Sequence, residues 1–129
     1  MPAGLLNGFR VLDFGSGISA PWCAKILADY GAEVIKVETP DSGDLSRRTG
    51  PFADDDPNLE KSLTFLYLNT NKKSVTLDLS SVSGRRLLHR LIADADVLVE
   101  NQPPGVSKDL GLDYQSLASV NPGLVVTSI

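Results

Sequence analysis

The stretch that decides the fold runs from Val11 to Glu38 and has the sequence VLDFGSGISAPWCAKILADYGAEVIKVE. It begins with an apolar run that ends at Phe14, passes through a glycine-containing loop, and continues as an amphipathic segment from Pro21 to Gly31. A second apolar run, Val34–Val37, follows. Proline favours the first turn of a helix, and glycine favours the position just after the last turn. The stretch therefore predicts a strand, a tight loop, a helix and a second strand, which is a βαβ unit with parallel strands.

Large apolar side chains recur along the predicted helix at helical spacing. Trp22, Ile26, Leu27 and Tyr30 fall on one face, with Cys23 beside them, so we expect this face to be the packed one. We interpret Cys23 as a packing residue rather than a nucleophile, because no His or Asp partner lies near it in the sequence.

The composition is that of a single globular domain. The chain has 129 residues, of which 42% are hydrophobic and 22% charged, with a formal net charge of −4 and a pI near 4.8. An acidic chain without a clustered basic face argues against nucleic-acid binding. A single cysteine fits a reducing compartment. No apolar stretch is long enough to span a bilayer, so we expect no membrane partner and a cytoplasmic location.

The middle of the chain alternates between polar and apolar segments. Thr39–Lys61 predicts a long irregular loop, a candidate lid or pocket wall. Its Asp54–Asp56 run predicts a solvated loop rather than a metal site, because cation loops space their ligands at alternate positions. Ser62–Leu68 is a further apolar run, and Ser74–Leu79 predicts a strand with Val75, Leu77 and Leu79 on its buried face.

The remainder continues the α/β alternation. Ser80 or Ser81 caps a predicted helix whose first turn is weakened by Gly84 and whose apolar stripe is Leu87, Leu88, Leu91, Ile92 and Ala95. His89 falls on the polar side of this helix, which predicts a solvated side chain. The later segments are a strand at Asp96–Glu100, a helical turn near Val106–Leu110, a helix from Asp113 to about Val120, and a strand at Leu124–Ile129. This order predicts an α/β fold, a Rossmann-like open parallel sheet with helices on both faces.

Two motifs leave alternatives open. Gly15, Gly17 and Ala20, with Glu38 ending the second strand, formally match the dinucleotide-binding fingerprint, so an NAD-dependent oxidoreductase is one alternative. The match is imperfect, because Pro21 removes a helix N-terminal amide that would hold the pyrophosphate. The Asn69–Lys73 segment is either a structural turn or a clamp for an anionic ligand.

Segments along the whole chain carry a resemblance to a known family. They are Val11–Phe14, Ala20–Pro21, Leu27–Glu38, Gly43–Asp44 with Arg47, Asn69–Leu79, Ala95–Asn101, Pro104–Val106, Leu110–Leu112 and Asn121–Val125. In their order and spacing the chain resembles the class III CoA-transferase family, also called CaiB/BaiF, which includes formyl-CoA transferase and the related α-methylacyl-CoA racemases.

The resemblance implies that residues 1–129 are the N-terminal, CoA-binding portion of a longer large domain, in a protein that forms an interlocked homodimer. It implies coenzyme A as the carrier of an acyl substrate, a carboxylic acid acceptor and no metal. In family members the transfer proceeds through an aspartyl mixed anhydride and a thioester, with the catalytic Asp beyond the position of Ile129. No residue of this chain is therefore expected to be catalytic.

The resemblance also implies a set of CoA contacts at matching positions. They are Ile18, Ser19, Thr39, Leu77, Asp78, Leu79, Ser80, Asn101, Gln102, Lys108 and Asp109. Family members commonly have Arg at the positions of Thr39 and Asp109, where it suits the CoA phosphates. Lys108, Arg47 and Lys72 are the candidate replacements in this chain.

Several functions remain open at this point. The favoured one is the CoA-binding part of an acyl-CoA:carboxylate CoA-transferase. The alternatives are an α-methylacyl-CoA racemase, a non-catalytic CoA-binding or assembly module, and the NAD-dependent oxidoreductase.

Overall fold

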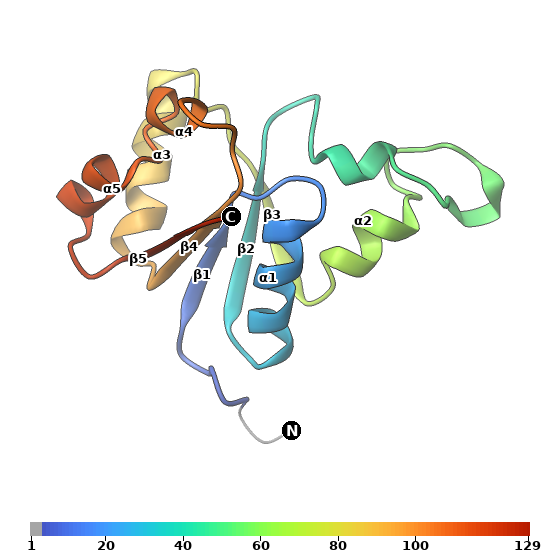
Figure 1. Cartoon of the computed structure of the whole chain (residues 1–129), viewed down its shortest axis with the longest axis horizontal. Helices are drawn as coiled ribbons and strands as arrows, with labels where there is room; N and C mark the ends of the chain where they lie inside the picture. The colour runs from blue at the N-terminus through green and yellow to red at the C-terminus, as the bar shows by residue number, and fades with distance from the viewer. Residues whose placement is uncertain (1–3) are drawn as a thin grey trace.

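The chain is built on a five-stranded sheet (Figure 1). The structure, a computed structural model, describes residues 4–129. The strands are β1 (Arg10–Asp13), β2 (Glu33–Glu38), β3 (Lys72–Thr76), β4 (Val97–Glu100) and β5 (Val125–Ser128). They lie in the order β3-β2-β1-β4-β5, and every neighbouring pair is parallel. The predicted Rossmann-like parallel sheet is confirmed.

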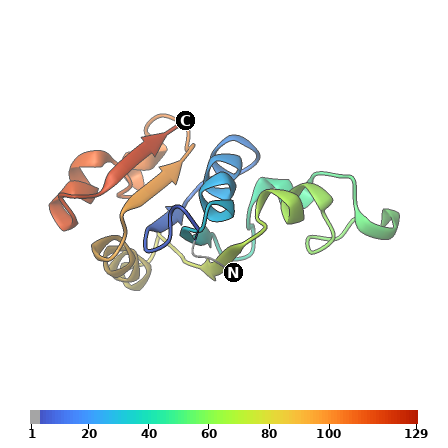
Figure 2. The ribbon, with the colours of Figure 1, turned by 90° about the horizontal axis from the view of Figure 1, so that it is seen from below.

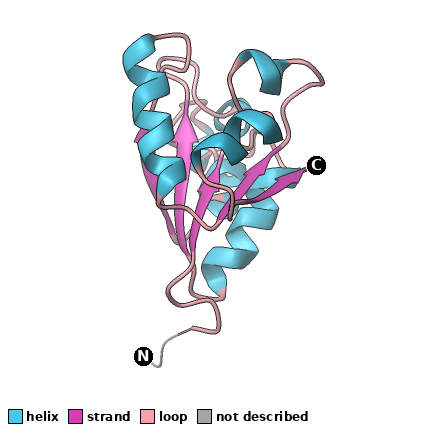
Figure 3. Ribbon diagram, turned by 90° about the vertical axis from the view of Figure 1, so that its left-hand side faces the viewer, coloured by secondary structure: helices cyan, strands magenta, loops and turns pink. Residues whose placement is uncertain are grey.

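Successive side chains of the central strands point to opposite faces of the sheet, and each face is covered by helices (Figure 3). Val11 and its register partner Val34 pack on the side of helix α1 (Ser19–Asp29). Leu12 packs on the other side, in the core shared with α3 (Val82–Ala93) and α5 (Tyr114–Val120). The helices predicted on both faces are therefore present.

The packed face of α1 is not the one predicted. Its small residues Ala20, Ala24 and Ala28 are buried, whereas Trp22 is 41% exposed and Tyr30 is 56% exposed. Alanine brings the helix backbone close to the sheet, which leaves no room for larger side chains on that face. The Trp22 ring instead lies 5.7 Å from the Tyr67 ring, measured between centroids.

The segment between β2 and β3 extends away from the sheet (Figure 2). It contains two short 3₁₀ helices, η1 (Leu45–Arg48) and η2 (Ala53–Asp55), and the helix α2 (Leu63–Leu68). The apolar run that contains α2 begins at Ser62, whose hydroxyl caps this helix and also donates to the carbonyl oxygen of Ser46 at 2.6 Å. The segment thus has fixed contacts of its own despite its irregular sequence.

Strand β3 begins and ends earlier than the sequence predicts. Its residues lie at the edge of the sheet and Val75 is 37% exposed, while Leu77 and Leu79 are buried in the chain that follows the strand. Gly84 of α3 also has a role that helix propensity does not predict. A Cβ at this position would lie 1.8 Å from the carbonyl oxygen of Asp78, so only glycine permits this approach.

The C-terminal elements match their predictions closely. Ser81 and Asp113 cap α3 and α5, and the helical turn α4 covers Val106–Asp109. No helix between residues 4 and 129 is long and apolar enough to cross a membrane.

Candidate functional site

A cleft of about 490 Å³ opens at the carboxyl ends of the strands. Its walls come from the loops that follow β1, β2 and β4, from the chain before α3 (Val82–Ala93) and from the chain after α4 (Val106–Asp109). The lining residues are Phe14, Gly15, Ser16, Val37, Glu38, Thr39, Ser42, Gly43, Asp44, Leu45, Arg48, Leu77, Leu79, Asn101, Gln102, Pro103, Leu110 and Leu112. An apolar floor with a few polar groups at the rim is typical of small-molecule sites.

The cleft lies at the point where the strand order reverses. Strands β1 and β4 are neighbours in the sheet although β2 and β3 separate them in the sequence. The loops leaving β1 and β4 therefore diverge, and open α/β sheets bind ligands in the crevice between such loops.

Asn101, just after β4, holds the loop that follows β1. Its side-chain amide donates to the carbonyl oxygen of Ser16 at 2.8 Å and to the Ser19 hydroxyl at 3.0 Å, and its Oδ1 accepts from the Ser16 N–H at 2.8 Å. Gln102 donates to the carbonyl oxygen of Phe14 at 3.0 Å. These contacts fix one wall of the cleft.

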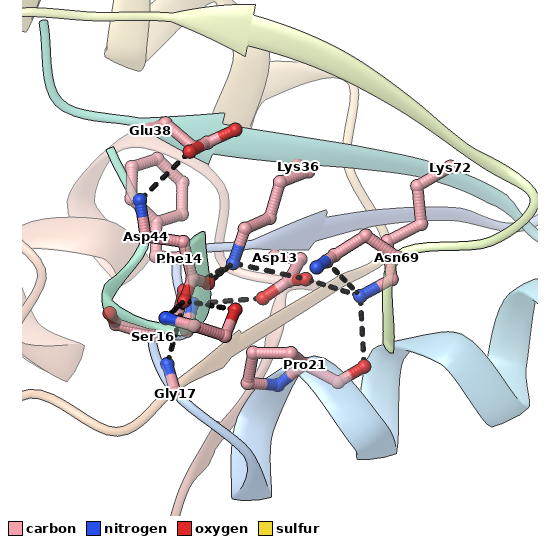
Figure 4. Close-up of polar contacts among 12 residues, drawn as sticks. Asp13, Phe14, Ser16, Gly17, Pro21, Lys36, Glu38, Asp44, Asn69 and Lys72 are labelled. Atoms are coloured by element: carbon pink, nitrogen blue, oxygen red, sulfur yellow. Dashed lines mark hydrogen bonds and ion pairs between the residues drawn. The ribbon is translucent and has the colours of Figure 1, made fainter. Parts of the chain in front are cut away.

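A buried ionic network lies beneath the same loop (Figure 4). The Lys36 ammonium donates to Asp44 and to the carbonyl oxygen of Gly15, each at 2.5 Å. Asp44 in turn accepts from the N–H of Gly17 at 2.9 Å, so the loops after β1 and β2 are joined through these two side chains. Burial opposes ionisation of Asp44, but the Lys36 charge and these hydrogen bonds outweigh it and lower the pKa of the carboxyl below its ordinary value.

Lys72 belongs to the same network. Its ammonium donates to Asp13, to the carbonyl oxygen of Pro21 and to Asn69, each at 2.8 Å, which uses all three of its donors. Burial lowers the pKa of Lys72, and the Asp13 charge offsets part of this effect. The Asn69–Lys73 segment therefore works as a structural turn that carries Lys72 inward.

Glu38, the acid at the end of β2, is occupied by protein partners. Arg47 donates to both of its carboxylate oxygens, at 2.7 and 2.8 Å, and the Asp44 N–H donates to one of them at 2.8 Å. Burial would raise the pKa of Glu38, but these partners lower it. A carboxylate used in this way is not free to bind ribose hydroxyls, which argues against the dinucleotide alternative.

The structure brings together five of the predicted contact residues. Thr39, Leu77, Leu79, Asn101 and Gln102 all line the cleft. The other six lie outside the lining: Ile18 and Ser19 at the start of α1, Asp78 and Ser80 on the exposed chain before α3, and Lys108 and Asp109 on α4.

Sequence reasoning missed several lining residues. Phe14, Ser42, Leu45, Arg48 and Leu112 line the cleft but were not among the predicted contacts. The prediction that Thr39–Lys61 supplies a pocket wall is confirmed, because Ser42, Leu45 and Arg48 belong to that segment. The Gly43–Asp44 pair near the start of that segment belongs to the family resemblance and was the sequence feature that pointed to this wall.

The other reactive side chains lie away from this cleft. Cys23 packs against the α1 side of the sheet, and burial followed by the Asp13 charge raises the pKa of its thiol. His89 is exposed on α3. Asp54 and Asp56 lie beside Lys61, at 3.6 and 2.8 Å. Among residues 4–129 no group of three His, Cys, Asp or Glu side chains is placed to hold a metal ion.

The fold is that of a Rossmann-like α/β domain with a cleft at its topological switch point. The profile of CoA-transferase family III matches residues 6–129. The chain belongs to this family.

Curated relatives support the same membership. Formyl-CoA:oxalate CoA-transferase of Afipia carboxidovorans is 45% identical over 124 residues, and its counterpart from a Rhodopseudomonas palustris strain is 46% identical. Each alignment covers 96% of this chain and 28% of the relative, so the chain spans little more than a quarter of their length.

Solved structures share the fold at similar identity. A CaiB/BaiF family protein from Brucella suis matches with a TM-score of 0.87 at 39% identity, over 98% of this chain and 33% of that protein. Rv3272 from Mycobacterium tuberculosis matches with a TM-score of 0.85 at 40% identity, over 99% of this chain and 35% of that protein.

Proposed function

We propose that residues 1–129 form the CoA-binding portion of the large domain of an acyl-CoA:carboxylate CoA-transferase. The observation that carries this proposal is the convergence of Thr39, Leu77, Leu79, Asn101 and Gln102 on one cleft at the switch point of the sheet. The apolar floor suits the uncharged parts of CoA, and the polar rim suits its charged parts. The names of the curated relatives make formyl-CoA and oxalate the first substrates to test.

The proposed transfer uses a nucleophile outside this portion. An aspartate beyond Ile129 attacks the acyl thioester, which forms an acyl-aspartyl mixed anhydride and releases CoA as a thiolate. The thiolate attacks the aspartyl carbonyl of this anhydride, which gives an aspartyl-CoA thioester and releases the donor acyl group as its carboxylate. The acceptor carboxylate then displaces the thiolate to form a second anhydride, and the thiolate attacks its acceptor carbonyl, which gives the new acyl-CoA and the free aspartate. The carboxylates that line the cleft do not suit this role, because Glu38 is held by Arg47 and Asp44 by Lys36. The proposal includes an interlocked homodimer working in the cytoplasm.

Titration calorimetry tests whether the protein binds CoA, and the Asn101→Ala variant tests whether CoA binds in the cleft beside Asn101. We expect the purified protein to bind CoA and Asn101→Ala to raise the Kd about tenfold, because the loop after β1 loses three hydrogen bonds from the Asn101 side chain.

Asn58→Ala is the matched control, since Asn58 is exposed on the segment between β2 and β3 and does not line the cleft. An unchanged Kd in Asn101→Ala would contradict the placement. Turnover is tested with protein that includes the region of the proposed aspartate: chromatography of its reaction with formyl-CoA and oxalate should show oxalyl-CoA and formate.

A further inference from the structure

The charged side chains that line the cleft differ in whether they form ion pairs within the described residues. Three of the lining residues are charged: Glu38, Asp44 and Arg48. Both acids are neutralised by cations behind the wall, since Arg47 lies 2.7 Å from Glu38 and Lys36 lies 2.5 Å from Asp44. Arg48 is therefore the positive charge that the described part of the wall presents to the cleft.

Arg48 is anchored but keeps most of its hydrogen-bonding capacity. Its side chain donates once, to the carbonyl oxygen of Ser42 at 2.5 Å, and this is its one hydrogen-bond partner within residues 4–129. A guanidinium has five N–H donors in a planar fork that matches the oxygens of a phosphate. The residue is exposed, so these donors face the solvent at the rim.

The position of Arg48 is set by its neighbours in η1. Asp44 caps this short helix by accepting from the Ser46 N–H at 2.8 Å, and the bidentate pairing of Arg47 with Glu38 ties it to the end of β2. The Ser42 hydroxyl lies 2.5 Å from that of Thr39, so Thr39, Ser42 and Arg48 form one continuous polar rim.

The three cations suggested by the sequence do not occupy this rim. Arg47 is committed to Glu38 and Glu60, and Lys72 has no free donor. Lys108 lies on α4 and is not among the residues that line the cleft.

We propose that Arg48 binds a phosphate group of CoA at the rim of the cleft. This inference rests on the proposed function, because CoA is the phosphate-bearing ligand named there. A guanidinium held at one N–H and free at the others binds such a group bidentately, with little loss of side-chain entropy.

The test compares Arg48→Gln with Arg86→Gln, a matched exposed arginine of α3 that does not line the cleft. Calorimetry with CoA should give a Kd raised about tenfold or more in Arg48→Gln and unchanged in Arg86→Gln. Binding by the unsubstituted protein should weaken with salt, and this dependence should be smaller in Arg48→Gln.

Two further ligands separate the outcomes. Dephospho-CoA lacks the 3′-phosphate. If Arg48→Gln loses affinity for CoA but not for dephospho-CoA, Arg48 binds the 3′-phosphate. If the variant loses affinity for both ligands equally, Arg48 binds the pyrophosphate. Pantetheine has no phosphate, and its affinity should be the same in both proteins. An unchanged Kd for CoA in Arg48→Gln, or an equal loss for pantetheine, would overturn the inference. Failure of the unsubstituted protein to bind CoA would instead overturn the proposed function.

Discussion

Lys72 is a buried cation whose removal should have a large effect on stability. Its side chain is 1% exposed and lies 2.8 Å from Asp13, which is itself fully buried. In Lys72→Met the Asp13 carboxylate keeps only Lys36, at 3.8 Å, as a cationic partner. The variant should therefore lower the free energy of unfolding by about 3 kcal/mol, the lower end of the range for a broken buried ion pair. Urea denaturation followed by circular dichroism measures this change.

The neighbouring Lys73 provides the control for that experiment. Its side chain is 69% exposed and pairs with Glu33 at the surface. Lys73→Met should change the free energy of unfolding by no more than about 0.5 kcal/mol. Similar losses in the two variants would contradict the structural role assigned to Lys72.

Asp44 predicts a specific dependence of stability on pH. Its pKa in the folded protein is lowered because the Lys36 charge and the hydrogen bonds outweigh burial. Its contribution to stability is therefore complete above the pKa of the unfolded chain, about 3.9, and is lost as the pH falls through the folded value.

The free energy of unfolding measured between pH 6 and pH 3 should fall less steeply in Asp44→Asn than in the unsubstituted protein. Asp55→Asn, at an exposed carboxylate in η2, should keep the original slope. Equal slopes in all three proteins would show that Asp44 does not carry this proton linkage.

At the scale of single elements, a glycine-to-alanine change in the first turn of α3 should have the opposite effect on stability to the one that helix propensity predicts. Replacing glycine by alanine within a helix ordinarily stabilises it by about 1 kcal/mol. At Gly84 the new Cβ would lie 1.8 Å from the carbonyl oxygen of Asp78. Gly84→Ala should therefore lower the free energy of unfolding by about 1–3 kcal/mol, as overpacking does.

Thermal denaturation measures this effect, and Ser83→Ala is the neighbouring control because Ser83 is exposed in the same turn. A higher Tm in Gly84→Ala than in the unsubstituted protein would show that propensity dominates and that the close approach is relieved at little cost.

The elements themselves were largely predictable from the sequence. Capping residues such as Ser81 and Asp113 marked helix starts, and apolar runs such as Val34–Val37 marked buried strands. The packed face of α1 was not predictable in the same way. Hydrophobicity favours Trp22 and Tyr30, whereas the close approach of the helix to the sheet selects the small Ala20, Ala24 and Ala28.

The candidate site was predictable only in part, for a spatial reason. The family resemblance implied Asn101 and Thr39 as contacts, and both line the cleft. The pairings that decide which cations stay free join residues far apart in the sequence, such as Lys72 with Asp13. Neither spacing nor composition contains that information, and so Arg48 was missed.

At the scale of the whole sheet, β5 is the outermost strand on its side among residues 4–129. In the part of the chain that the structure describes, β5 pairs with β4 alone, and Val125 is 57% exposed. An unpaired apolar edge favours association with other strands. Light scattering at increasing concentration should show less association in Val125→Lys than in the unsubstituted protein.

Val82→Lys serves as the control for this edge effect, because Val82 is 88% exposed at the start of α3, away from the strand edges. Equal reduction in both variants would attribute the change to net charge rather than to the strand edge.

The exposed contact between α1 and α2 gives the protein a built-in optical probe. Trp22 is the single tryptophan in the chain, and its ring lies beside that of Tyr67 on α2. Indole emission changes in colour and intensity with the polarity and quenching groups around the ring. Because α2 ends the segment whose beginning forms one wall of the cleft, the fluorescence of this one side chain reports whether that segment stays docked when a ligand enters.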